Sequence, residues 1–177
     1  FYLSILLLCS TSTLAQTDTL NQYDEKGLRQ GYWIIYGHMK PEKGYPGEGV
    51  IEEGPYVNDR KEGEWIKYFP DGKTPRLIGV YKRNRPNGCY SKYYPSGKLR
   101  ETGCFINGKS TGQFKTYFEC GKLWHLKNLD ENGKEQGFST FYYNTCDCPD
   151  SSFQALEYVC KKIDGITVDY AYRYHKS

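Results

Sequence analysis

Aromatic-rich and alternating runs recur along this chain between short polar segments. The run "EWIKYF" is followed by "PDGK", and "QFKTYF" is followed by "ECGK". Aromatic and β-branched residues favour strands, whereas clusters of Pro, Asp, Ser and Gly favour tight turns. Each such pair therefore predicts the first strand and the tip of a β-hairpin. The run "LRETGCF" after one of these tips predicts a short return strand.

The same pattern repeats at a nearly fixed period, which is typical of repeat architectures. The stretch "YVNDRKEGEWIKYFPDGK" returns as "YKRNRPNGCYSKYYPSGK" and again as "FINGKSTGQFKTYFECGK". A glycine starts each unit, at Gly31, Gly63, Gly88, Gly112 and Gly137. Two residues later stand Trp33, Trp65, Tyr90, Phe114 and, departing from the pattern, Ser139. Five residues later the residue is always tyrosine, at Tyr36, Tyr68, Tyr93, Tyr117 and Tyr142.

These units predict a mostly all-β fold, an array of about five antiparallel hairpins joined by further turns. Asn107-Gly108 is one such turn, because it suits positive φ. The first spacing, Gly31 to Gly63, is longer than the later ones, which predicts an insertion around "HMKPEKGYPGEG". The segments "DEKGLRQG" and "DENGKEQG" resemble each other and predict two variant turns, each leading into a hairpin.

The C-terminal segment departs from the repeat. In "DSSFQALEYVCKKI" the apolar residues follow one helical face, with Ser151 or Ser152 as the N-cap, so we expect a helix from Ser152 to Lys162. The run "ITVDYAYRY" then alternates as a strand. The array is expected over residues 23–145, and residues 146–177 are expected to form a helix-plus-strand cap over its last hydrophobic face.

The units "GEWIKYFPDGK", "GCYSKYYPSGKLRETGCFING" and "GQFKTYFECGKL" resemble the MORN-repeat variant family of bacteria. The resemblance covers roughly Tyr23 to Tyr143. It implies a β-hairpin array that mediates binding and carries no chemical activity of its own. Many members of that family bear the label of antitoxins in toxin–antitoxin systems, a role that fits an exported protein poorly.

Residues 1–15, "FYLSILLLCSTSTLA", are uncharged and apolar, and end in small residues. We expect them to be a signal peptide whose start is missing, followed by a linker at residues 16–22; a buried N-terminal strand is the alternative. We therefore expect export to the periplasm, cell surface or medium. Removal of the signal peptide leaves an even number of cysteines, at Cys89, Cys104, Cys120, Cys146, Cys148 and Cys160. In an oxidising compartment these favour disulfides over a metal site that Cys146 and Cys148 would form with Cys120 and Cys160.

The hairpin register suggests how these cysteines pair. A four-residue loop from Pro95 to Lys98 places Tyr94 opposite Leu99 and, in the same register, Cys89 opposite Cys104. Directly opposed residues are close enough for a bridge, whereas a three-residue loop would shift the register and spoil the pairing. Two further bridges, Cys120–Cys146 and Cys148–Cys160, are expected, although Cys146 and Cys148 could exchange partners.

No sequence feature points to catalysis. The three histidines, His38, His125 and His175, lie in no zinc or hydrolase motif and are interpreted as exposed or incidentally paired. There is no nucleophile elbow or phosphate-binding loop, and we expect no enzyme activity, cofactor or metal. The net charge of +3 is dispersed along the sequence, which argues against nucleic acid and does not favour a membrane surface.

The aromatic stripes leave two interpretations open. The chain has 18 tyrosines, so aromatic side chains must supply much of the buried area. Packing is favoured for the stripe through Trp65 and for the tyrosine ladder, and an exposed aromatic groove for a peptide, glycan or lipid headgroup is the alternative. The expected function is a non-enzymatic binding scaffold whose partner is another protein or an envelope component. A toxin-neutralising immunity protein and a peripheral membrane-surface binder are the alternatives.

Overall fold

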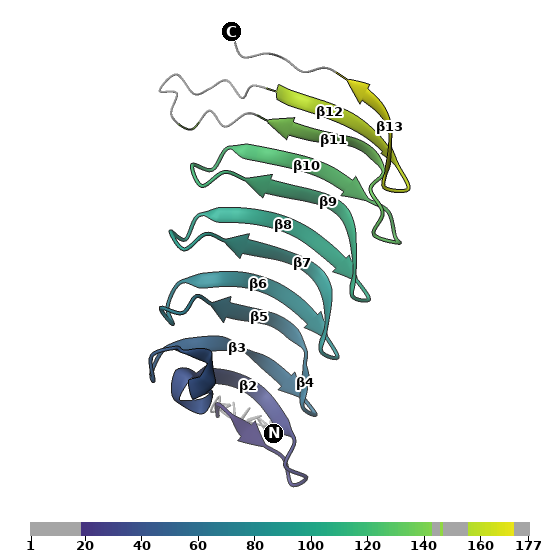
Figure 1. The fold of residues 1–177 in the computed structure, drawn as a ribbon. Helices are drawn as coiled ribbons and strands as arrows, with labels where there is room; N and C mark the ends of the chain where they lie inside the picture. Colours follow the sequence, from purple (N-terminus) through teal and green to yellow (C-terminus); the bar gives the residue numbers. More distant parts are fainter. Residues whose placement is uncertain (1–18, 143–145, 147–155, 172–177) are drawn as a thin grey trace, which may run out of the picture.

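The computed structural model describes residues 19–142, 146 and 156–171. These form one 13-stranded antiparallel sheet in which sequential strands are neighbours, with β4 pairing beside β3 (Figure 1). The strands are β1 (Gln22–Tyr23), β2 (Arg29–Tyr36), β3 (Val50–Val57), β4 (Arg60–Lys61), β5 (Gly63–Tyr68), β6 (Pro75–Lys82), β7 (Arg85–Tyr93), β8 (Leu99–Ile106), β9 (Lys109–Tyr117), β10 (Leu123–Leu129), β11 (Gly137–Tyr142), β12 (Leu156–Ile163) and β13 (Ile166–Ala171). The predicted all-β array of hairpins is confirmed.

Ten of the strands form five hairpins, namely β2–β3, β5–β6, β7–β8, β9–β10 and β11–β12, and β1, β4 and β13 complete the sheet. The loops of the first four form one long edge, which we call the tip rim, on the left of Figure 1. The turns that connect one hairpin to the next form the opposite edge, which we call the turn rim, on the right. The array is therefore one open layer of strands bounded by two rims of turns.

The glycine that starts each unit has a positive φ in all five units, between 69° at Gly31 and 129° at Gly88. It also lies where the strand register slips. Gly79 pairs with Tyr90, but Tyr81 pairs with Pro86, so β7 carries extra residues around Gly88. A side chain is disfavoured in this backbone conformation, which explains the recurrence of glycine in the sequence.

In the third hairpin the loop is one residue shorter than the four residues expected from the sequence. The Tyr94 N–H donates to the Lys98 carbonyl and Tyr93 pairs with Leu99, so the loop contains three residues. A β-bulge at Arg100 then shifts the register back, because Lys92 pairs with Glu101 and Cys89 with Cys104. The cysteine pairing was predicted correctly although the loop is one residue shorter than expected. The bulge on the return strand compensates for the missing loop residue and restores the expected register.

The predicted insertion in the first hairpin is confirmed. It consists of two short 3-10 turns, η1 (Gly37–Met39) and η2 (Pro41–Lys43), followed by an irregular segment. That segment packs on the tip of the next hairpin: the Val50 N–H donates to the Gly72 carbonyl at 3.0 Å. The Tyr45 hydroxyl donates to the Tyr68 carbonyl at 2.8 Å. The insertion therefore buttresses the tip rim between the first two hairpins.

The two variant turns that the sequence predicted have the same hydrogen bonds. In the first, Asp24 Oδ1 accepts the N–H groups of Lys26 and Leu28, both at 2.9 Å. In the second, Asp130 Oδ1 accepts from Asn132 at 2.8 Å and from Lys134 at 2.9 Å. The sequence similarity between these segments therefore reflects one turn structure that is used twice.

The core is a row of rings, each lying beside a glycine. Trp33, Trp65 and Tyr90 are 6%, 0% and 7% exposed. Each pairs across its hairpin with a buried return-strand glycine: Gly54, Gly79 and Gly103 respectively. A Cβ at Gly54 would lie 2.6 Å from the Trp65 ring. Glycine thus leaves room for the ring of the neighbouring hairpin, so a single sheet can bury aromatic side chains.

The helix expected from Ser152 to Lys162 is wrong where the structure describes it. Leu156–Ile163 is strand β12, which pairs with β11 from Gly137↔Lys162 to Tyr142↔Leu156. Residues 151–155 lie outside the described residues. Pairing as a strand provides hydrogen-bond partners for the backbone N–H and C=O groups that β11 would otherwise expose at its edge. The sheet thus continues through β12 and β13. The strand predicted over residues 166–174 is confirmed as β13 from Ile166 to Ala171, and residues 172–174 lie outside the described residues.

Candidate functional site

The stripe through Trp65 forms the core rather than a binding groove. Trp65 is fully buried, with Tyr56 packed edge-on at a centroid distance of 4.8 Å. The Lys61 ammonium lies 3.9 Å from the centre of the indole ring and also pairs with Glu52 at 2.6 Å. Burial lowers the pKa of Lys61, and the hydrogen bond that its ammonium donates to Glu52 opposes this shift. The aromatic faces are therefore covered by the chain's own side chains.

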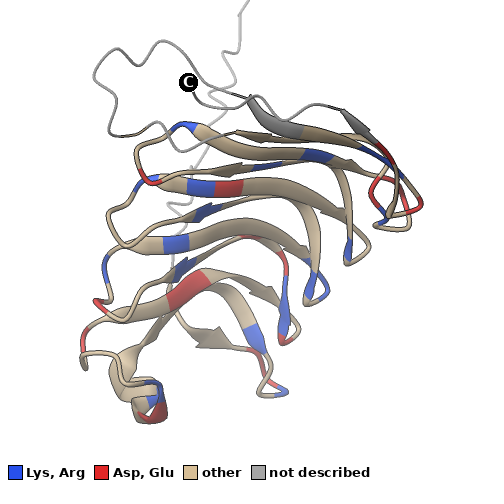
Figure 2. Cartoon of the chain, turned by 45° about the horizontal axis from the view of Figure 1, so that its top comes forward, with Lys and Arg blue, Asp and Glu red and all other residues tan. Residues whose placement is uncertain are grey.

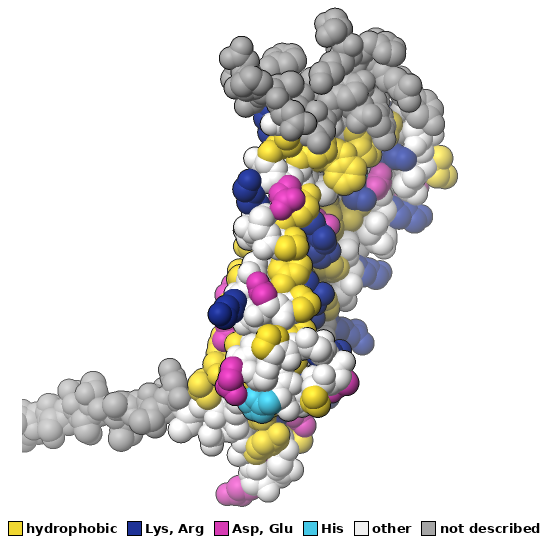
Figure 3. Space-filling model, turned by 60° about the vertical axis from the view of Figure 1, so that its left-hand side comes forward, with side chains coloured by type: hydrophobic (Ala, Val, Ile, Leu, Met, Phe, Trp, Pro, Cys, Tyr) yellow, Lys and Arg dark blue, Asp and Glu magenta, His cyan; other side chains and the backbone are white. Residues whose placement is uncertain are grey.

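The ladder tyrosines Tyr36, Tyr68, Tyr93, Tyr117 and Tyr142 are all half-buried. The Tyr68 hydroxyl donates to the Glu53 carboxylate, and burial together with that bond raises its pKa well above the usual value. The Tyr94 hydroxyl donates to the Tyr117 carbonyl at 2.7 Å. Figure 3 shows hydrophobic side chains running along the array on the side of the tip rim. The hydrogen bonds of Tyr68 and Tyr94 join successive hairpins, which supports the packing interpretation.

A second ion pair of the same kind lies in the middle hairpin. Lys92 and the Tyr90 hydroxyl both donate to Glu101, at 2.8 and 2.5 Å. Burial opposes ionisation of Glu101, but these bonds outweigh it and hold its pKa below the usual value. In the fourth hairpin region Lys127 pairs with Glu135 at 2.7 Å. These charges are internally compensated and therefore unavailable to a ligand.

Two of the expected disulfides are present. Cys89–Cys104 bridges β7 and β8, with 3.9 Å between the Cα atoms. Cys120–Cys146 links the fourth tip to the segment after β11, with 5.7 Å between the Cα atoms. Cys148, the expected partner of Cys160, lies outside the described residues. Cys160 itself is buried and forms no disulfide within the described part of the chain.

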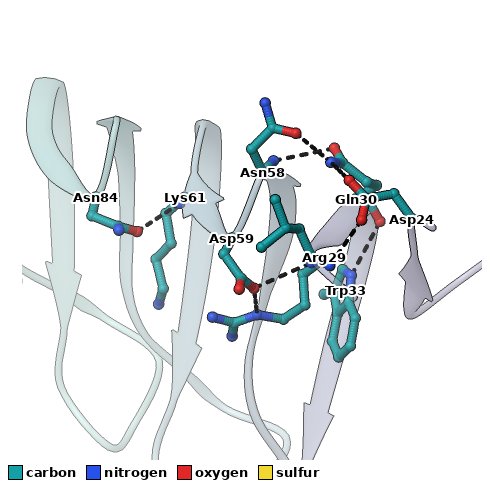
Figure 4. A network of polar contacts seen from close by, with 9 residues as sticks. Asp24, Arg29, Gln30, Trp33, Asn58, Asp59, Lys61 and Asn84 are labelled. Carbon is teal, nitrogen blue, oxygen red and sulfur yellow. Dashed lines mark hydrogen bonds and ion pairs between the residues drawn. The ribbon is translucent and has the colours of Figure 1, made fainter. Parts of the chain in front are cut away.

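Polar contacts lock the turn rim into a regular edge (Figure 4). Asp59 Oδ1 accepts the Arg29 backbone N–H at 3.2 Å and its Nε at 2.5 Å. These bonds from Arg29 hold the pKa of Asp59 below its usual value. In the next turn, Asn84 Oδ1 accepts the Lys61 N–H at 2.7 Å. Each of these two turns is thereby fixed to the hairpin before it.

A row of cations projects from this fixed edge. The turns Asn58–Asp59, Arg83–Asn84 and Asn107–Gly108 all have two residues with positive φ. The residue directly after each turn is a cation, and these are Arg60, Arg85 and Lys109. We call these three residues the cation row. Figure 2 shows Lys and Arg segments gathering along this edge of the sheet.

The cation row is exposed and uncompensated. Lys82 and Arg83, in the middle turn, add two further exposed cations. Within the described residues, none of these five side chains forms an ion pair. Of the nearby carboxylates, Asp59 pairs with Arg29, whereas Glu62 accepts the Arg83 backbone N–H at 2.8 Å and keeps its negative charge beside these five cations. The rim therefore presents positive charge to solvent.

Two shallow grooves follow this rim. The first has a volume of about 630 Å³, and its lining residues are Arg60, Lys82, Arg83, Arg85, Asn87 and Asn107. The second, of about 830 Å³, includes Arg60 and Arg83 together with Leu28 and Glu62 in its lining. Cations and amide groups from neighbouring turns line the first groove, and Glu62 adds a carboxylate to the second. This arrangement can hold an anionic ligand.

The sequence did not predict this site, because the charges are dispersed along the chain. Arg60, Arg85 and Lys109 are far apart in sequence, and only the pairing of hairpins brings them into one row. The signal was available in the repeat register: "NDR", "RNR" and "NGK" place a cation at the same position after each turn. Cations that are dispersed along the sequence are therefore clustered on the turn rim.

A buried polar pair was also missed. His125 Nε2 lies 2.8 Å from Ser139 Oγ, and its ring stacks on Phe141 at 3.9 Å. Burial, followed by the charge of Lys127, lowers the pKa of His125. Ser139 is only 2% exposed, so this pair is inaccessible to a substrate and is structural. His38 is exposed with Nδ1 2.9 Å from the Gly47 carbonyl, and His175 lies outside the described residues.

Other kinds of site are not seen where the structure is described. Among those residues, no group of three His, Cys, Asp or Glu side chains could hold a metal ion. In the same part of the chain, no helix has the length and apolar character needed to cross a membrane.

Comparison with known proteins adds little. No family model matches the chain, and no curated protein matches it. A solved structure with some similarity is the crystal structure of the GtfA/B complex bound to UDP and GlcNAc, at 11% identity and a TM-score of 0.31. The aligned part covers 46% of this chain and 20% of that chain. So weak a likeness carries no argument about fold or function.

Proposed function

We propose that this chain is an exported, non-enzymatic repeat protein of the MORN-like type that acts as a binding scaffold in the cell envelope. The observation that carries the proposal is the exposed, unpaired cation row on the turn rim. The two disulfides are compatible with an oxidising environment outside the cytoplasm. The scaffold's role is to hold these cations at a fixed spacing, which lowers the entropy lost on binding.

Affinity capture from native envelope material tests this function. The bait is the exported chain, and a rim variant carries Arg60→Gln, Arg85→Gln and Lys109→Gln. The matched control carries Arg76→Gln, Lys98→Gln and Arg100→Gln, which removes the same charge from exposed positions towards the tip rim. We expect the same envelope component with the wild type and the control, and its loss with the rim variant. Equal recovery with all three baits, or with none, would contradict the proposal.

A second candidate function is binding to a membrane surface. It is favoured by Val57 and Ile106, which stand directly before two of the turns and are 49% and 61% exposed. Aliphatic side chains beside cations are typical of proteins that bind anionic membrane surfaces. Co-sedimentation with vesicles containing anionic lipid checks this function. Binding that falls when Val57 and Ile106 are both replaced by serine would favour it over the first.

A further inference from the structure

We infer that the turn rim binds a linear acidic polysaccharide, which lies along the cation row from Arg60 through Arg85 to Lys109. This inference rests on the proposed scaffold function and names the class of its ligand. Its basis is the geometry of the row, because the three cations occupy the same position in successive connections of one sheet. A ligand that meets all three must be extended and must carry charge at intervals.

The spacing of the row selects among extended polyanions. Successive turns lie two strands apart, which is about 10 Å in a β-sheet. That distance is close to the length of one disaccharide unit, so a polysaccharide with one carboxylate per disaccharide presents its charges in step with the row. An extended peptide fits poorly. Its side chains on one face are spaced about 7 Å or about 13 Å apart, and neither distance equals the spacing of about 10 Å between successive cations.

The groove beside the row suits sugars as well as charge. Asn87 and Asn107 line it together with Arg60 and Arg85. Asn87 Oδ1 accepts the Asn107 backbone N–H at 3.0 Å, which fixes the orientation of the amide and leaves its NH₂ group to donate. Amides and guanidinium groups are hydrogen-bond donors for hydroxyl and carboxylate oxygens. The groove can thus contact the uncharged parts of a glycan between its carboxylates.

The row is less suited to a single small anion. A lone phosphate or sulfate needs several donors that converge on one point, whereas these cations are distributed over three turns. The turn residues at the outer edge are also polar, as in Asn58–Asp59 and Arg83–Asn84. These residues, rather than aliphatic ones, would meet a bilayer first.

Binding of hyaluronan oligosaccharides tests the inference, because they carry one carboxylate per disaccharide. Titration calorimetry with chains of two, four, six and eight sugars should show affinity rising up to six sugars and then levelling, once three carboxylates face three cations. Uncharged chitooligosaccharides of the same lengths are the ligand control. We expect the rim variant to weaken binding of the longest chain by about tenfold or more. The matched control variant should change it by less than about twofold, and added salt should weaken binding.

Several results would overturn the inference. These are affinity independent of chain length, equal losses in the rim and control variants, or tighter rim-dependent binding to anionic vesicles or to polyglutamate. Failure to bind any acidic oligosaccharide would also overturn it. If envelope capture still yielded a component that depends on the cation row, the scaffold function would stand and only the ligand class would be wrong.

Discussion

The first three hairpins and the last two share one backbone pattern but are held together by different chemistry. In the first three, Trp33, Trp65 and Tyr90 are buried beside return-strand glycines. In the last two, half-buried Phe114 pairs with Lys127, and Ser139 pairs with Cys160. There the Ser139–His125 contact takes the place of a buried ring, whereas Lys–Glu ion pairs and a disulfide occur in both regions.

This difference shows which part of the repeat is obligatory. The unit-starting glycine keeps its positive φ in both regions, at Gly63 and at Gly137 alike. The ring two residues later does not persist, because Ser139 replaces it without interrupting the pairing of β11 with β12. Backbone geometry therefore defines the repeat, while the means of filling its interior varies from one end to the other.

The largest expected effect comes from removing the ring at the centre of the aromatic region. Trp65→Ala should lower the free energy of unfolding by about 3–5 kcal/mol, because the indole is fully buried. Phe114→Ala should cost distinctly less, since its ring is half-buried. Urea unfolding monitored by circular dichroism measures both. Equal losses would mean that the two regions do not differ in packing.

The counterpart in the second region is the disulfide. Replacing Cys120 and Cys146 with serine should cost about 3 kcal/mol through the entropy of the unfolded chain, given a sequence separation of 26. Because repeat arrays unfold in parts, the loss should be concentrated in β9 to β12. Hydrogen exchange of individual amides locates it. Uniform acceleration over the whole sheet would show that the two regions unfold as one unit.

A graded series of glycine variants tests the contact between ring and glycine. A Cβ at Gly103 would lie 2.7 Å from the Phe114 ring, whereas at Gly79 the nearest atom is 3.1 Å away. Gly103→Ala should therefore cost about 1–3 kcal/mol and Gly79→Ala less. Gly47→Ala is the control, because nothing lies within 4 Å of that position. Thermal unfolding gives the order, and a reversed order would reject this account of the core.

The smallest expected effect is a pH dependence confined to the second region. Burial lowers the pKa of His125 below its usual 6.5, so the unfolded chain binds a proton more readily than the folded one. The contribution of neutral His125 to the free energy of unfolding is therefore fully present above pH 6.5. It is lost as the pH falls from there towards the folded-state pKa. Hydrogen exchange in β10 and β11 at several pH values measures the loss. The same dependence in His125→Gln would assign it to another group.

Local signals in the sequence predicted much of the fold. Glycines mark conformations that other residues avoid, and turn residues such as Asn107-Gly108 mark the reversals, so the hairpins could be placed. Asp164-Gly165 carries the same signal, with φ of 52° and 81°, and joins β12 to β13. This turn signal favours a hairpin, rather than the helix expected at Ser152–Lys162.

Other features depended on pairing that no local pattern contains. The Cys89–Cys104 register results from a three-residue loop and a bulge at Arg100, and the bulge exists only relative to the opposite strand. Leu156–Ile163 is a strand because β11 offers it a backbone edge, which overrides its helical spacing of apolar residues.

The sequence by itself determined the repeat, the hairpins and the positions of their turns, since these depend on the φ preferences and side-chain alternation of a few adjacent residues. Only the tertiary structure decided which residues become neighbours across hairpins. It brought Arg60, Arg85 and Lys109 into one row on the turn rim, although they stand in separate units of a chain with mixed charge. Lateral hydrogen bonding between strands sets that alignment, and it acts between segments that no local window of sequence contains together.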